Sequence, residues 1–167
     1  MKMKIIIINM LLLNLMFSCK RENVRTDVEQ FVRLVQEDKY DKDSLPHFTF
    51  KAIPELLKYA SDFSEIKHFP INPISSYGPN HLTVGECLLW TIEAIRVFNP
   101  PINVRLGFPS FVPELGIKGD INTPFLNDNQ LTEVYNLYKN WWENNTGKDF
   151  DITRQIDPLE NSLYIWK

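Results

Sequence analysis

Apolar residues recur every three or four positions in four stretches of the chain, and this spacing predicts four amphipathic helices. The first is expected from Thr26 to about Asp38, because Thr26 and Glu29 have the spacing of a capping box. The second is expected from about residue 50 to residue 60, with Pro54 near its first turn, where a missing N–H costs least. Their apolar stripes contain Val28, Phe31, Val32 and Val35 in the first helix and Ile53, Leu56, Leu57 and Ala60 in the second.

The third stretch has the widest apolar belt, which predicts the central and most buried helix. Thr83 and Glu86 form a second capping-box pattern at its start, and it is expected to end near Phe98. The fourth helix is expected from about residue 129 or 130 to residue 144. The stripes contain Val84, Leu88, Ile92 and Ile95 in the third helix and Leu131, Val134, Tyr135, Tyr138, Trp141 and Trp142 in the fourth.

Long proline-rich loops, residues 63–80 and 99–128, separate these helices. We expect the first loop to be ordered and packed on the domain, and the second to be a long connection with room for a short hairpin. Residues 163–166 alternate too briefly to distinguish an edge strand from an extended tail. The predicted fold class is therefore mainly α, with about four amphipathic helices in a compact bundle or a HEAT-like antiparallel arrangement.

Residues 1–18 have the pattern of a secretory signal, with Lys2 and Lys4 before the apolar run from Ile5 to Phe17. That run has 13 residues, whereas a spanning helix needs about 20. The segment Met16-Phe17-Ser18-Cys19 resembles the lipobox of bacterial lipoproteins, which implies a lipid on the Cys19 sulfur. We therefore expect a signal peptide over 1–18, a lipidated tether over 19–25 and a single domain over 26–167. The expected location is the cell envelope, lipid-anchored to the outer membrane on its periplasmic or surface face.

Charge narrows the possible partners of the mature chain. Loss of Lys2 and Lys4 leaves 16 basic against 21 acidic residues, a net charge of −5. This mildly acidic balance does not favour nucleic acid. Once Cys19 is lipidated, Cys87 is the remaining cysteine, so no intrachain disulfide is expected.

Cys87 is a candidate nucleophile, because its place near a helix N-terminus would lower a thiol pKa. The segment from Gly85 to Trp90 is faintly similar to the Gly-x-Cys-x-x-Trp of papain-like proteases, which need a histidine after the cysteine. All three histidines, His47, His68 and His81, precede it. We therefore expect Cys87 to be a buried core residue. The histidines lack metal-ligand spacing, so neither a metal nor another cofactor is predicted.

Glu86 and Glu93 could lie on one helix face, about 10 Å apart. Together with a loop histidine they define the alternative function, an envelope hydrolase. The expected role of both is structural, Glu86 as part of the cap and Glu93 as a partner of a loop amide or of Arg96. No catalytic residue is therefore predicted.

Aromatic, proline-rigid loops favour a non-enzymatic binding or protein-interaction domain, with an envelope protein or a glycan as partner. A toxin-neutralising immunity protein would be one concrete form. The candidate binding residues lie in the two long loops and in the fourth helix: Phe69, Tyr77, Phe108, Phe111, Trp141 and Trp142.

Several segments resemble an uncharacterised family of small lipoproteins from Gram-negative gut bacteria. The resemblance covers most of residues 25–167, implies a mainly helical lipoprotein domain and carries no known activity. Its most specific parts are Asn72-Pro73-Ile74-Ser75-Ser76 and Leu88-Leu89-Trp90-Thr91-Ile92-Glu93-Ala94-Ile95-Arg96, with Ala52-Ile53-Pro54-Glu55-Leu56-Leu57 and Tyr164-Ile165-Trp166 in support.

Overall fold

In a computed structural model of the protein, residues 23–79, 81–98, 107–120 and 125–167 are described. These residues form a mostly helical domain with one small antiparallel sheet, which confirms the predicted mainly α class. In chain order the elements are α2 (Val24–Gln36), the 3-10 helix η1 (Phe50–Ala52), α3 (Ile53–Leu57), α4 (Val84–Phe98), β1 (Leu115–Ile117), α5 (Asp128–Asn145), α6 (Phe150–Thr153) and β2 (Tyr164–Trp166).

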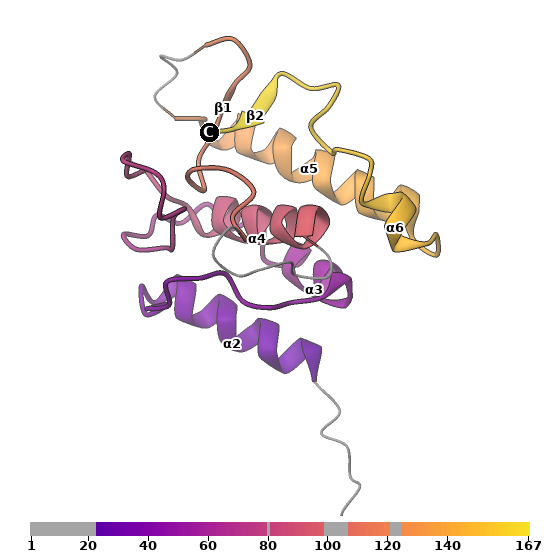
Figure 1. Cartoon of the computed structure of the whole chain (residues 1–167), viewed down its shortest axis with the longest axis horizontal. Helices are drawn as coiled ribbons and strands as arrows, with labels where there is room; N and C mark the ends of the chain where they lie inside the picture. Colours follow the sequence, from indigo (N-terminus) through magenta and orange to yellow (C-terminus); the bar gives the residue numbers. More distant parts are fainter. Residues whose placement is uncertain (1–22, 80, 99–106, 121–124) are drawn as a thin grey trace, which may run out of the picture.

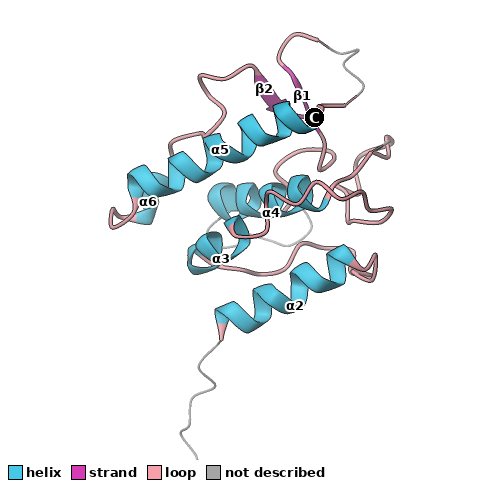
Figure 2. Cartoon of the chain, turned by 180° about the vertical axis from the view of Figure 1, so that it is seen from behind, coloured by secondary structure: helices cyan, strands magenta, loops and turns pink. Residues whose placement is uncertain are grey.

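The helices lie in successive layers, with α2 at one end, α3 and α4 in the middle, and α5 on the far side (Figures 1 and 2). The two-stranded sheet lies beside α5, at the end of the domain opposite α2 (Figure 1). Helix α4 is the central element, as its wide apolar belt predicts, because most of its residues are buried and Trp90 is fully enclosed.

The first helix begins earlier than the sequence predicts. Helix α2 starts at Val24, and its N-cap Asn23 makes no side-chain capping bond, so the proposed Thr26–Glu29 capping box is wrong. At the other end the chain leaves the helix through Asp38, whose φ is +54°. The Asp38 carboxylate accepts a hydrogen bond of 2.6 Å from the N–H of Lys67, which ties the end of α2 to the 63–80 loop.

The second helix is shorter than predicted, because α3 ends at Leu57. Beyond it the chain turns to pair with the segment that starts α4. The N–H of Ile66 donates to the Leu82 oxygen at 2.9 Å, and the N–H of Gly85 donates to the Asp62 oxygen at 2.6 Å. Because these residues bond to the start of α4, the chain does not continue as a helix beyond α3.

At the C-terminal end, α5 begins one or two residues before the prediction, at a capping box formed by Asn127 and Gln130. Helix α6 was not predicted. Residues 164–166 form a strand, one of the two alternatives left open, and this strand pairs antiparallel with β1 so that Gly116 faces Ile165. The strand partner of β1 thus comes from a segment that follows α5 and α6 in the sequence. Among the described residues of the 99–128 loop, the loop pairs with itself at a single bridge, between Ile117 and Asp120, while β1 pairs outside the loop.

The signal, Cys19 and the tether up to residue 22 lie outside the described residues. Of the helices that are described, none combines the length and the apolar character that crossing a membrane requires.

Candidate functional site

Two loops and the last residue of the chain enclose a groove with a volume of about 460 Å³. We call it the loop groove. One wall comes from residues 74–77 and the other from residues 111–112, while Lys167 closes one side. The full lining is Ile74, Ser75, Ser76, Tyr77, Phe111, Val112 and Lys167.

Main-chain hydrogen bonds hold the walls of the groove in place. The N–H of Asn72 donates to the Phe111 oxygen at 3.1 Å, which joins the two loops. The Asn72 side-chain oxygen also accepts from the N–H of Ile74 at 3.1 Å. On the other side, the N–H groups of Phe111 and Val112 both donate to the main-chain oxygen of Lys167, at 3.0 and 3.2 Å. The groove is therefore braced by bonds between segments far apart in the sequence.

Three large apolar side chains at the groove are exposed, Ile74 by 66%, Tyr77 by 47% and Phe111 by 58%. Tyr77 and Phe111 were candidate binding residues, and the structure brings them together. Ile74 lies in one of the two loops predicted to form the contact surface but was not singled out, whereas Lys167 was missed. An apolar residue directly after Pro73 was the available signal for Ile74, whereas Lys167 reaches the groove only through the pairing of β1 with β2.

Three other candidate binding residues are buried, so their assignment to a contact surface is corrected. Phe108 stacks on Trp90 with ring centroids 5.2 Å apart, and Phe69 packs among core rings that include Phe31. The Trp141 indole donates to the main-chain oxygen of Thr153 at 3.2 Å inside the domain. The sixth candidate, Trp142, is half-buried on the surface of α5.

Two buried carboxylates, Glu114 and Glu86, lie at the start of strand β1. Glu114 is almost fully enclosed and its Oε1 binds the Lys167 ammonium at 2.6 Å, while its Oε2 has no hydrogen-bond partner among the described residues. Glu86 binds the Thr83 hydroxyl at 2.9 Å and accepts from the N–H of Leu115 at 3.3 Å. Burial raises the pKa of Glu86 to about 7; its two hydrogen bonds oppose the rise and the nearby charge of Glu114 adds to it.

One half of the predicted capping box is present at the start of α4. The Thr83 hydroxyl accepts a hydrogen bond from the N–H of Glu86 at 3.2 Å. The Glu86 carboxylate in addition binds strand β1, which no local pattern predicts.

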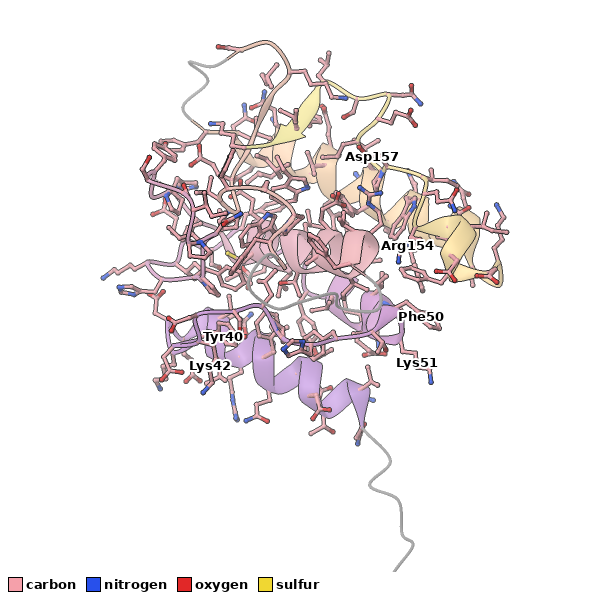
Figure 3. All side chains as sticks on the ribbon, viewed as in Figure 1. Tyr40, Lys42, Phe50, Lys51, Arg154 and Asp157 are labelled. Carbon is pink, nitrogen blue, oxygen red and sulfur yellow. The ribbon has the colours of Figure 1, made fainter. Side chains whose placement is uncertain are left out.

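Glu93 belongs to a different network. Its carboxylate binds the Arg96 guanidinium, as predicted, and also accepts from the Tyr138 hydroxyl at 2.9 Å. The Tyr138 oxygen in turn accepts from the Trp166 indole at 2.8 Å. Arg96 reaches across to the main-chain oxygen of Arg154 at 2.9 Å, near the end of α6 (Figure 3). This network joins α4, α5, α6 and β2.

The possible catalytic groups do not converge. Glu86 and Glu93 have separate partners, and among the described residues neither lines the loop groove or any of three further pockets of the domain. Cys87 is fully buried, and burial raises its thiol pKa, the opposite of the shift expected from its place near a helix N-terminus. In the described part of the chain no cluster of three or more His, Cys, Asp or Glu residues is arranged to hold a metal ion.

A larger pocket of about 660 Å³ lies between residues 40–43 and the 67–73 segment. Tyr40 and Lys42 belong to its lining and lie close to α2 (Figure 3). Its lining mixes two lysines and a histidine with Asp41 and Asp43, so charges of both signs face it and it has no focused potential.

Residues 22–167 match the model of a protein family described as a domain of unknown function, DUF4943, and the chain belongs to this family. A search of curated proteins and a search of solved structures each find no match.

Proposed function

We propose that this member of the DUF4943 family is a lipid-tethered binding domain of the cell envelope, which holds an apolar segment of a partner protein in the loop groove. The observation that carries the proposal is the exposure of Ile74, Tyr77 and Phe111 around one concave site. Exposed apolar side chains gathered at one place on a small domain are typical of an interaction surface.

The bracing of the loops supports a binding role for this surface. Both walls are held by hydrogen bonds to Asn72 and Lys167, so little conformational freedom is lost when a partner docks. Affinity then comes from the area that the three apolar side chains bury, at roughly 25 cal/mol per Å² before the costs of association.

The position of the groove fits a tether at Cys19. Helix α2 begins five residues after Cys19, and five extended residues span at most about 18 Å. The chain end that closes the groove lies at the end of the domain opposite α2 (Figure 1). A lipid on Cys19 would therefore leave the groove facing away from the bilayer, where a protein partner can reach it.

The contacts of the acidic residues favour binding over the alternative of an envelope hydrolase. A hydrolase using Glu86, Glu93 and a loop histidine needs these groups around one open cleft. Glu86 is bound by Thr83 and Leu115, whereas Glu93 is bound by Arg96 and Tyr138, so the two carboxylates belong to separate networks.

We also infer that the helices form a compact bundle rather than HEAT-like pairs. Helix α4 contacts α2, α3 and α5, which supports a single central helix surrounded by others. Helix α3 has five residues, too short to form an extended pair with α4.

The tether is tested by palmitate labelling of the full-length protein in a Gram-negative host. We expect label on the native chain and none on Cys19→Ala, with that variant released from the membrane fraction. Membrane-bound, unlabelled wild-type protein would contradict the lipid anchor and leave the groove proposal standing.

The groove is tested by cross-linking in the native envelope, with Phe111→Ala and Tyr77→Ala against Ile152→Ala. Ile152 is 61% exposed and lies on α6, away from the groove, so it is the matched control. We expect one cross-linked partner to be lost in the groove variants and kept in the control. Equal cross-linking in all three variants would overturn the proposal.

A further inference from the structure

A second, smaller pocket lies between α3 and α5, with a volume of about 220 Å³. We call it the Trp142 pocket. Pro54 and Leu57 form an apolar side on α3, and the rings of Tyr135 and Trp142 lie on α5. Charged side chains complete the lining, which is Pro54, Leu57, Lys58, Tyr135, Lys139, Trp142 and Glu143.

The indole N–H of Trp142 differs from those of the other three tryptophans. The Trp90 indole donates to Ser110 at 2.8 Å, and the Trp141 and Trp166 indoles donate to Thr153 and Tyr138. Among the described residues, neither the Trp142 indole N–H nor the Tyr135 hydroxyl has a hydrogen-bond partner. Both residues are half-buried and neither polar atom is among the buried unpartnered ones, so the pocket presents two solvent-accessible polar groups beside two aromatic rings.

The charged groups around the pocket belong to solvent-accessible ion pairs. Lys139 and Glu143 are 4.0 Å apart and both are exposed, at the outer limit of an ion pair. Lys58 binds Glu55 at 2.6 Å, with its side chain more than half exposed. Such side chains can turn toward a ligand at small cost, because exposed ion pairs contribute little to stability.

We propose that the Trp142 pocket binds one pyranose ring of a glycan. A sugar ring has C–H groups on its faces and hydroxyls on its edge. The C–H groups match the electron-rich face of the indole, and the hydroxyls match the free N–H, the phenol and the charged rim. An aliphatic peptide side chain would fill the space and leave the indole N–H and the phenol unpaired, which is unfavourable on burial.

The volume agrees with this ligand class, since about 220 Å³ lies below the range of roughly 300–1,000 Å³ for drug-sized ligands and suits a single ring. The Trp142 pocket and the loop groove share no lining residue. The glycan site therefore stands independently of the protein-binding groove, and either proposal can fail without the other.

The test uses the full-length protein in a detergent without sugar headgroups and follows the four indole N–H signals by NMR. The probes are N,N′-diacetylchitobiose, maltotriose and digalacturonic acid, each titrated to about 10 mM, the weak end of specific affinities. The Trp142 signal is assigned from its loss in Trp142→Phe. We expect at least one probe to move this signal saturably while the Trp90 signal stays in place.

Affinity measured by calorimetry on variants decides the role of the ring. We expect Trp142→Ala to weaken binding by about tenfold or more and Trp142→Phe to weaken it less, because phenylalanine keeps an aromatic face. Phe111→Ala, in the loop groove, should bind the sugar as the native chain does. The proposal is overturned if no probe moves the Trp142 signal saturably, or if Trp142→Ala binds as tightly as the native chain.

Discussion

The main-chain oxygen of Ala60 lies 2.6 Å from the position that a Cβ atom on Gly85 would occupy. The oxygen of Asp62 is 3.0 Å from the same position and also accepts from the Gly85 N–H at 2.6 Å. The turn after α3 and the first turn of α4 therefore approach as closely as two backbones can, and a glycine is needed at the contact.

Gly85→Ala should consequently destabilise the domain. The added methyl meets main-chain atoms, which cannot rotate away, so one of the two segments must shift. We expect a loss of about 2 kcal/mol or more, in the range of overpacked core sites. Urea unfolding followed by circular dichroism measures it. Gly78→Ala is the control, because nothing lies within 4 Å of its Cβ position and it should change little.

The stability of the domain should fall as the pH rises from about 5 to about 8. The pKa of Glu86 is raised from 4.5 to about 7 in the fold, so the folded protein binds more protons than the unfolded chain between these values. Linkage then lowers stability as the pH rises through this window. We expect Glu86→Gln, which stays neutral, to be more stable than the native chain above pH 7 by on the order of 3 kcal/mol. The measurement is thermal unfolding of both proteins at pH 5 and at pH 8. A difference in stability between the two proteins that is the same at both pH values would contradict this prediction.

The contribution of Asp38 to stability should be lost at low pH, whereas that of Glu86 is lost as the pH rises. Hydrogen bonds from the N–H groups of Lys67 and His68 lower its carboxyl pKa, so its contribution is present above the unfolded pKa and is lost as the pH falls through the folded one. Asp38→Asn should be mild, since asparagine tolerates the positive φ and still accepts a hydrogen bond. Asp38→Ala loses the side-chain acceptor and the tolerance of a positive φ, so it should lower stability more than Asp38→Asn does. Urea midpoints at neutral pH rank the variants, and equal midpoints would exclude a role for the Lys67 bond.

Tyr138→Phe should weaken the contact between α5 and the rest of the domain. The Tyr138 hydroxyl is fully buried, donates to Glu93 and accepts from Trp166. Its removal leaves the partly buried Trp166 indole N–H without this acceptor and the Glu93 carboxylate without this donor, so we expect a loss of about 1–3 kcal/mol. Tyr59→Phe is the comparison, because no hydrogen bond of the Tyr59 hydroxyl is described. Chemical denaturation of the two variants side by side gives the difference.

The exposed apolar residues at the groove should limit solubility rather than stability. We expect Phe111→Ala to leave the unfolding free energy within about 0.5 kcal/mol of the native value, as for surface substitutions generally, and to reduce self-association. Phe108→Ala, a core change beside Trp90, should cost about 3–5 kcal/mol. Thermal melts and light scattering separate the two effects.

The sequence by itself determined the elements that depend on local pattern. The apolar stripes of α2, α4 and α5 were predicted, and so was the central place of α4, because the width of an apolar belt reports how much of a helix is covered. The pairing of Glu93 with Arg96 followed from a spacing of three residues. The lipid on Cys19 also rests on local pattern alone and stays a prediction.

Only the tertiary structure decided features that join distant segments. Helix α3 stops at Leu57 because residues 62–66 pair with the start of α4, and β1 takes its partner from beyond α6. The sequence of a loop does not distinguish an exposed aromatic side chain, such as Phe111, from a buried one, such as Phe108. The physical reason is that burial and strand pairing depend on which parts of the chain meet in space, and periodicity along the chain reports only the face that a residue shares with its near neighbours.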